Sequence, residues 1–182
     1  MAAARPSPRI VAAVAALDPG AGERILEVGC GHGVALSLLA ERPGGGRVTG
    51  IDRSAKMAAA ARARNGEHLD AGRVRVEQSR FEDFDPAEER FDRIFAINVA
   101  PFWRADQAPS FLNRARKLLR PGGELFVFNQ PPAWPQGAAD RFASSLGAML
   151  AGAGWEVTRT VTEAMPPAAM VGVAARPASR QR

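Results

Sequence analysis

Short apolar runs alternate with longer segments of helical periodicity from residue 24 almost to the C-terminus. Strands separated by helices are typical of an α/β domain built on a doubly wound, mostly parallel sheet. Residues 93–98, preceded by Phe91 and Asp92, form a nearly continuous apolar run, which indicates a central strand covered on both faces. The pattern predicts seven strands, at residues 24–28, 47–52, 74–78, 93–98, 124–129, 155–162 and 169–175, and four helices between them, at residues 34–41, 54–69, 110–119 and 138–151.

The last two expected strands are separated only by residues 164–168. A crossover between parallel strands needs about a dozen residues or more. These two strands should therefore pair as an antiparallel hairpin at one edge of the sheet.

The segment before the first strand has the pattern of a short helix. Ile10, Val11, Val14 and Leu17 fall on one helical face, and the turn-forming residues 18–20 end the helix. Nearby arginines resemble a secretion signal, but the apolar stretch is short and runs directly into a strand that the sheet needs. We therefore expect a single domain over residues 1–182, with an N-terminal helix within 1–23 and a disordered basic tail at 177–182.

Composition and charge limit the class of protein, its expected compartment and its expected partners. Its 182 residues are 46% hydrophobic and 24% charged, which fits a globular domain, and no apolar run approaches the ~20 residues of a membrane span. The one cysteine, Cys30, can form no internal disulfide, so a reducing cytoplasm is the expected location. The net charge of +5, carried largely by arginine, hints at nucleic acid only weakly, because a solvated basic surface accounts for it more simply.

The clearest chemical signal is a glycine-rich turn after the first expected strand, with the spacing Glu27-x-Gly29-x-Gly31-x-Gly33. Positions without a side chain allow a tight turn and a close approach of a ligand to the backbone. A dinucleotide fingerprint would place another glycine where Val34 stands, which disfavours a nicotinamide cofactor. An acid ahead of the turn suits a ligand that carries an amino group better than a pyrophosphate.

This turn resembles the first motif of the class I S-adenosylmethionine-dependent methyltransferases, and the resemblance covers roughly residues 10–175. The stretch at 48–52 resembles the second strand of that family, ending in the acid Asp52. Residues 91–98 are similar to its fourth strand, and residues 118–125 to its turn into strand five, where a proline and two glycines stop the helix and reverse the chain.

The resemblance implies a cofactor, S-adenosylmethionine, and residues that bind it. By that resemblance Glu27 holds the methionine ammonium, directly or through water, and Asp52 binds the ribose hydroxyls. The same resemblance places Gly29, Cys30, Gly31 and Gly33 around the methionine and ribose, and Arg53 and Met57 near the adenine.

One stretch departs from the family pattern. After strand three the family usually has an acid near the adenine amino group, whereas this chain has Ser79-Arg80-Phe81, and an arginine cannot accept that hydrogen bond. Backbone groups of Arg80 and Phe81 can bind the adenine instead, with the Arg80 guanidinium either stacked on the ring or turned outward. Alternatively, Glu82 or Asp83 can substitute for the missing acid.

Two further stretches bear on the resemblance to this family. Residues 130–134 resemble the Asn-Pro-Pro-aromatic signature of amino-group methyltransferases but stand after strand five rather than strand four, so that role is not transferred. Asn98, at the position that follows strand four, is expected either to touch the methionine part of the cofactor or to cap the strand.

The acceptor side carries weaker signals. Phe102, Trp103 and Trp134 stand in the two loops expected at the mouth, either as walls of an acceptor site or as packing anchors. His32 lies in the glycine turn, either facing an acceptor or as a loop residue whose backbone matters. No residues have metal-ligand spacing or a Ser/His/Asp arrangement, so neither a metal nor a nucleophile is predicted, and no catalytic residue is assigned.

These observations favour a methyltransferase acting on a small-molecule acceptor by in-line transfer. One alternative is an enzyme that methylates RNA or another macromolecule, and another is a scaffold subunit that binds the cofactor without catalysis. The acceptor, the atom methylated and the oligomeric state do not follow from the sequence. The RNA alternative would use a basic stripe composed of Arg47, Arg53, Lys56, Arg62, Arg64, Arg73 and Arg75.

Overall fold

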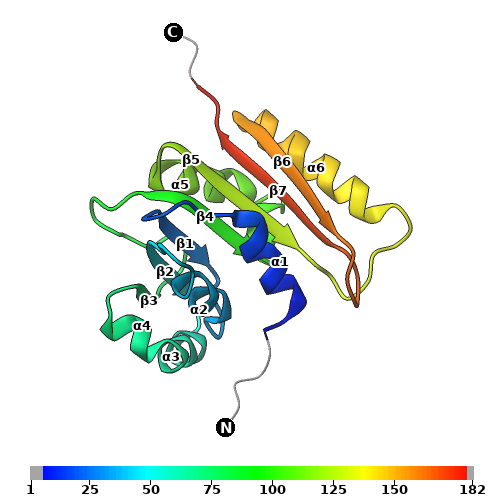
Figure 1. Cartoon of the computed structure of the whole chain (residues 1–182). Helices are drawn as coiled ribbons and strands as arrows, with labels where there is room; N and C mark the ends of the chain where they lie inside the picture. Colours follow the sequence, from blue (N-terminus) through cyan, green and yellow to red (C-terminus); the bar gives the residue numbers. More distant parts are fainter. Residues whose placement is uncertain (1–5, 180–182) are drawn as a thin grey trace.

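A computed structural model describes residues 6–179 and contains one seven-stranded sheet in the order β3-β2-β1-β4-β5-β7-β6. Figure 1 shows the sheet passing through the centre of the molecule, with the β6–β7 hairpin along one edge. Five strands run parallel, and β7 joins β5 antiparallel, with β6 antiparallel outside it. The strands are β1 (Arg24–Val28), β2 (Arg47–Asp52), β3 (Val74–Gln78), β4 (Phe91–Ile97), β5 (Leu119–Asn129), β6 (Trp155–Glu163) and β7 (Met170–Pro177).

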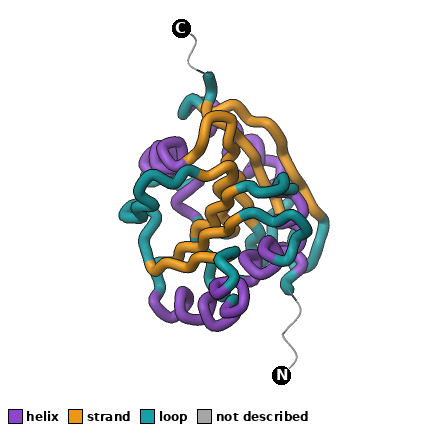
Figure 2. Tube along the Cα trace, turned by 60° about the vertical axis from the view of Figure 1, so that its left-hand side comes forward, coloured by secondary structure: helices purple, strands orange, loops and turns teal. Residues whose placement is uncertain are grey.

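Helices cover both faces of the sheet, as the view in Figure 2 shows. The core therefore has two halves, one on each side. Helices α5 (Ala108–Leu118) and α6 (Ala138–Gly152) bury their apolar residues on one face, with the short 3₁₀ turn η1 (Ala100–Phe102) beside them. The other face is covered by α1 (Pro8–Leu17), α2 (Val34–Ala40), α3 (Ala55–Arg64) and α4 (Gly66–Asp70).

The central strands are apolar on both sides because consecutive side chains point to opposite faces. In β1, Ile25 packs towards α1 and α2, whereas Leu26 packs towards α5. In β5, Phe126 likewise packs on the same face as Ile25, and Val127 on the same face as Leu26. This arrangement confirms the doubly wound, mostly parallel sheet and the C-terminal antiparallel hairpin expected from the sequence.

The chain order creates a switch point between β1 and β4. After β1 the chain builds outward through β2 and β3, then returns to place β4 on the other side of β1. Helices that leave two adjacent strands in opposite directions open a crevice at the carboxyl ends of those strands. This crevice is where the fold places a ligand.

Two boundaries differ from the sequence-based expectation. The helix expected over residues 54–69 is interrupted at Asn65, which ends α3 and precedes α4, because its side chain bonds to backbone groups of neighbouring segments. Strand β5 begins at Leu119, earlier than expected, because Leu119 already pairs with Phe91 before the Pro-Gly-Gly turn bulges out of the ladder. Both differences concern backbone detail rather than topology.

The ends of the chain add little to the site. The tail expected to be disordered at 177–182 is ordered at its start, because Pro177 ends β7 and the Ala178 N–H donates to the Gly154 carbonyl at 3.0 Å. The rest of this tail lies partly outside the described residues, as does the start of the segment 1–23, within which α1 forms. Across residues 6–179, none of the helices has the length and apolar character needed to cross a membrane.

Candidate functional site

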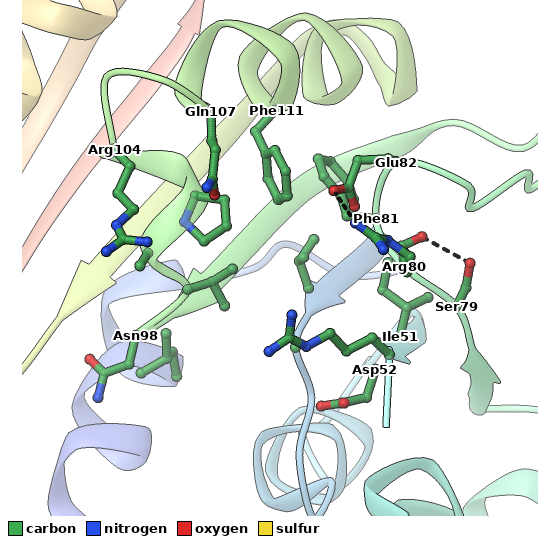
Figure 3. A pocket seen from close by; sticks show the side chains of 17 residues that line it. Ile51, Asp52, Ser79, Arg80, Phe81, Glu82, Asn98, Arg104, Gln107 and Phe111 are labelled. Carbon is green, nitrogen blue, oxygen red and sulfur yellow. Dashed lines mark hydrogen bonds and ion pairs between the residues drawn. The ribbon is translucent and has the colours of Figure 1, made fainter. Parts of the chain in front are cut away.

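A cavity of about 770 Å³ opens at the carboxyl ends of β1, β2 and β4. Figure 3 shows side chains from these strands and from the segments after β3 and β4 around it. Of the residues predicted from the sequence to bind the cofactor, six lie in its wall: Gly29, Asp52, Arg53, Arg80, Phe81 and Asn98.

The glycine turn after β1 forms one margin of the cavity. Its backbone is held to β2 by two hydrogen bonds, because the N–H groups of Gly29 and Cys30 both donate to the Ile51 carbonyl, at 2.8 and 3.0 Å. Gly31 has φ +51°, and a Cβ added there would meet no atom within 4 Å. The turn therefore leaves open space beside Gly31, as a cradle for a ligand requires.

Asp52, at the end of β2, locks the same turn. Its Oδ2 accepts a hydrogen bond from the Gly31 N–H at 2.9 Å, and its Oδ1 accepts one from the Ser54 N–H at 2.9 Å. The carboxylate is half-buried in the cavity wall, where each oxygen retains capacity for a further donor. Asp52 therefore fixes the turn and still presents acceptors to the cavity.

Glu27 is buried in β1 with 5% of its surface exposed, and its Oε2 atom has no hydrogen-bond partner within the described chain. Burial raises the pKa of this carboxyl well above its ordinary value of 4.5, and the neighbouring Asp52 charge raises it further. An unpaired buried carboxyl is costly, and a cationic partner removes that cost. Glu27 thus has the chemistry of an ammonium acceptor.

Cys30 and Gly33 contribute to the turn in different ways. The side chain of Cys30 is buried in the core, where burial raises the pKa of the thiol further above its ordinary value, with Glu27 and Asp52 adding to the shift. A Cβ on Gly33 would lie 2.6 Å from the amide of Asn65, so glycine is needed there for the packing of α3. Neither residue lines the cavity, and the expectation that they surround the methionine is not supported by side-chain position.

Asn65 supports the turn and was not identified from the sequence. Its amide nitrogen donates to the Gly33 carbonyl at 3.0 Å and to the Ala61 carbonyl at 2.9 Å, while its oxygen accepts from Ser37 at 2.8 Å. The residue is fully buried. The adjacent Asn-Gly pair, a common turn signal, could have indicated the break in the helix.

The segment after β3 provides the opposite wall. Arg80 turns outward and its Nη2 pairs with Glu82 at 3.3 Å, a contact drawn in Figure 3. Phe81 is buried against Phe102 and Phe111. Glu82 lies in the cavity wall, whereas Asp83 does not, so Glu82 is the better placed of the two expected substitutes for the missing acid.

Asn98 caps strand β4, the second of its two expected roles. Its side-chain oxygen accepts from the Gln130 N–H at 2.8 Å and its amide donates to the Gln130 carbonyl at 3.2 Å, which ties the ends of β4 and β5 together. Its φ of +59° lies in the left-handed region, where asparagine is better tolerated than most residues. Asn98 also lines the cavity, so a cofactor contact is compatible with this geometry.

The aromatic residues expected at the acceptor mouth are packing residues in the structure. Phe102 is fully buried, so the substrate-facing interpretation is wrong for it. Trp103 and Trp134 pack on Phe142 of α6, with ring centroids 5.5 and 5.4 Å from it, and the Trp134 indole donates to the Ala169 carbonyl at 2.7 Å. Neither tryptophan lines the cavity.

Four other predicted residues also lie outside the cavity wall: Glu27, Gly31, His32 and Met57. His32 is exposed, and its carbonyl accepts a hydrogen bond from Arg64 at 3.1 Å, which fits the interpretation of a loop residue whose backbone matters. Met57 lies half-buried at the start of α3, where its N–H donates to the Ser54 hydroxyl at 3.4 Å.

The acceptor side instead carries polar residues that the sequence did not single out. Arg104 and Gln107, between η1 and α5, lie in the wall together with Ala100, Pro101 and Phe111. An isolated arginine in a chain rich in arginine gives no sequence signal. Only the turn of the chain after η1 brings Arg104 to the cavity.

The basic stripe is partly engaged in local contacts. Arg62 donates twice to the Val76 carbonyl, Arg64 bonds to the His32 carbonyl, and Arg75 pairs with Glu77 at 2.7 Å. Of these three contacts, only that of Arg75 pairs the cation with an acid; the other two direct guanidinium donors to backbone carbonyls. Among residues 6–179 there is also no cluster of histidine, cysteine and acidic side chains that could hold a metal ion.

The fold and the cavity define the class of protein: a Rossmann-like α/β domain with a cavity at the switch point of its sheet, whose residues fit S-adenosylmethionine. The orphaned Glu27 oxygen suits the amino group, the Asp52 carboxylate suits the ribose hydroxyls, and the open space beside Gly31 admits the ligand.

Comparison with known proteins identifies the family. A family described as "Methyltransferase domain" matches residues 25–123, which is more than half of the chain, and the chain belongs to it. Its cofactor is S-adenosylmethionine, which fits the residues described above.

Individual relatives agree with this family. The chain is 31% identical over 110 residues to a ubiquinone biosynthesis O-methyltransferase of Dechloromonas aromatica, covering 59% of this chain and 44% of that protein. It is 31% identical over 135 residues to a phosphatidylethanolamine N-methyltransferase of Cereibacter sphaeroides, covering 69% and 63%. The chain thus spans less than two thirds of the length of these relatives.

A solved structure shows the same fold. Magnesium protoporphyrin IX methyltransferase of Synechocystis PCC 6803, crystallised with S-adenosylhomocysteine (SAH), superposes with a TM-score of 0.71 at 18% identity. The superposition covers 91% of this chain and 80% of the other.

Proposed function

We propose that this domain transfers a methyl group from S-adenosylmethionine to a small-molecule acceptor. The single observation that carries the proposal is the joint placement of Glu27 and Asp52 at the carboxyl ends of adjacent strands, one buried without a partner and the other lining the cavity. When bound, the cofactor supplies an electrophilic methyl, whose bond to sulfur breaks with its electron pair passing to sulfur as the acceptor atom bonds to carbon.

The residues of the chain contribute mainly by positioning. Glu27 would neutralise the ammonium of the cofactor, and Asp52 would accept hydrogen bonds from the ribose. The backbone at Arg80 and Phe81 would face the adenine. Because the sulfonium is already activated, orientation and exclusion of water can supply most of the acceleration without a dedicated base.

A small acceptor is favoured by the dimensions of the site. The cofactor and the acceptor would share a cavity of about 770 Å³, and the short segment from Asn98 to Gln107 forms part of its wall. The similarity to ubiquinone biosynthesis O-methyltransferases is consistent with this choice. The arginine contacts described above give the RNA alternative no specific support.

The test is a screen for SAH release from S-adenosylmethionine in the presence of pooled small metabolites or RNA. We expect release that depends on one or more metabolite pools and is abolished by Asp52→Ala. Release that requires RNA, with none from metabolite pools, would replace the small-molecule proposal by the macromolecular one. Cofactor binding without release from any pool would favour a scaffold subunit.

A further inference from the structure

We infer that the acceptor of this domain is an anion and that Arg104 binds its oxyanion group. The inference rests on the proposed function and adds the chemical class of the substrate. Figure 3 shows Arg104 and Gln107 on one side of the cavity and the Arg80–Glu82 pair on the other.

The basic and acidic residues of the cavity wall do not balance in charge. The wall contains three arginines and only two acids, Asp52 and Glu82. Glu82 pairs with Arg80, whereas Asp52 accepts hydrogen bonds from two neutral backbone N–H groups. Arg53 and Arg104 also line the cavity, and within residues 6–179 neither guanidinium takes part in a hydrogen bond or an ion pair. The cavity therefore presents uncompensated positive charge.

Arg104 is built into the site by its backbone rather than by its side chain. Its N–H donates to the Ala100 carbonyl at 3.1 Å, and its carbonyl accepts from the N–H groups of Gln107 and Ala108 at 3.0 and 2.8 Å. These three bonds fix the position of the Cα atom at the junction of η1 and α5. The guanidinium is left with all five of its N–H donors available.

The surroundings of Arg104 fit a small organic anion. Phe111 and Pro101 provide apolar wall beside it. Gln107 provides an amide whose nitrogen donates to Asp106 at 3.2 Å and whose oxygen has no hydrogen-bond partner among the described residues. Asp106 is exposed, lies outside the wall and does not pair with Arg104. A guanidinium recognises carboxylate and phosphate oxygens in a bidentate geometry, which gives orientation as well as affinity.

Binding of the anion by Arg104 would orient the acceptor relative to the methyl group. Arg104 lies across the cavity from Asp52, the residue proposed to bind the ribose of the cofactor. An oxyanion held at Arg104 would anchor the acceptor at one end and leave its nucleophilic atom to approach the methyl group. Arg104 is thus a specificity-determining residue rather than a proton acceptor.

The experiment compares matched probes on the chain saturated with SAH. Benzoate, phenyl phosphate and the neutral isostere benzamide are titrated by ligand-observed NMR into the parent, Arg104→Gln and Arg47→Gln. Arg47 is an exposed arginine at the amino end of β2, so its variant carries the same charge change away from the cavity.

We expect an anionic probe to bind the parent and Arg47→Gln about tenfold more tightly than benzamide, and Arg104→Gln to lose this preference while its SAH affinity stays unchanged. Tighter binding by phenyl phosphate than by benzoate would identify a phosphorylated acceptor, and the reverse order a carboxylate. Equal binding of all three probes, no binding by any of them, or a preference that survives Arg104→Gln overturns the inference. A parent that fails to bind SAH contradicts the proposed function itself, which separates the two failures.

Discussion

Gly31 and Asp52 are joined by a hydrogen bond of 2.9 Å from the Gly31 N–H to the Asp52 Oδ2 atom. This bond connects the turn after β1 to the end of β2, so the residue expected to hold the ribose also sets the shape of the glycine cradle. The carboxylate expected to bind the ribose therefore also holds the glycine turn in its conformation before the cofactor binds.

Asp52→Ala is expected to weaken binding of SAH by about 1 to 3 kcal/mol, because it removes the acceptor for the ribose hydroxyls and for two backbone N–H groups. The melting temperature should fall as well, since the turn loses its anchor. Calorimetry and thermal denaturation measure the two effects, with Asp70→Ala, at an exposed residue of α4, as the control. Unchanged affinity in a folded Asp52→Ala variant would refute the ribose assignment.

Gly31→Val is expected to abolish cofactor binding. A branched side chain at φ +51° strains the backbone and fills the open space beside the turn. Gly22→Val is a matched control, because Gly22 also has a positive φ of 73° and open space around it but lies ahead of β1, at the other end of the strands. Both variants should lose some thermal stability, and only Gly31→Val should lose SAH binding; equal affinities would place the cofactor elsewhere.

Glu27 predicts a dependence of stability on pH. Because burial and Asp52 raise the pKa of Glu27 in the folded chain, the folded state binds more protons than the unfolded state above about pH 4.5. The free energy of unfolding should therefore decrease as pH rises from that value through the raised pKa. Glu27→Gln should remove this slope and make the free protein more stable at neutral pH, as denaturant titrations at several pH values would show. A slope that persists in Glu27→Gln would assign it to another group.

The same residue predicts a proton change on binding. A cationic ammonium requires the ionised carboxylate, so binding of SAH at a pH below the raised pKa should release a proton. Calorimetry in buffers of different ionisation enthalpy measures this release. Glu27→Gln should bind more weakly and release none; equal proton release in the parent and the variant would exclude Glu27 as the group that titrates.

Trp103→Ala is expected to behave as the loss of a packing anchor. The ring packs edge-on against Phe142 and against the core beside α6, and truncation should cost about 3 kcal/mol of stability. Trp103 directly follows η1, whose residues Ala100 and Pro101 lie in the cavity wall, so its truncation should weaken cofactor and acceptor binding in parallel. Trp103→Phe should restore much of the stability and of the two affinities. A normal melting temperature with a selective loss of turnover would refute the packing role and indicate that Trp103 contacts the acceptor.

Topology was predictable because it depends on patterns that persist along the chain. The alternation of strands and helices predicted the doubly wound, mostly parallel sheet, and the short connection between the last two strands predicted the hairpin, whereas the strand order came only from the structure. The glycine spacing with Glu27 and Asp52 indicated residues that the structure brings together at the carboxyl ends of β1 and β2, because backbone turns and strand ends leave a fixed signature in sequence. Strand boundaries near Leu119 depended on a bulge that no periodicity reports.

The acceptor end was not predictable in the same way. Phe102 and Trp103 look like site residues in an irregular loop, yet their rings turn into the core because burying a large aromatic surface stabilises the fold more than exposing it. Arg104 and Gln107 lie in the cavity wall through the path of one 3₁₀ turn. Asn65 acts through partners 4 and 32 residues away in sequence, which a linear pattern does not reveal.

The most direct test of the central claim is a calorimetric titration of S-adenosylmethionine into the folded parent chain and into Glu27→Gln and Asp52→Ala. The geometry predicts saturable binding at one site in the parent and weaker binding in each variant, because each variant removes one of the two carboxylates that the cofactor needs. Folded parent protein that gives no saturable binding, or binding that is unaffected in both variants, would contradict the claim that Glu27 and Asp52 form an S-adenosylmethionine site.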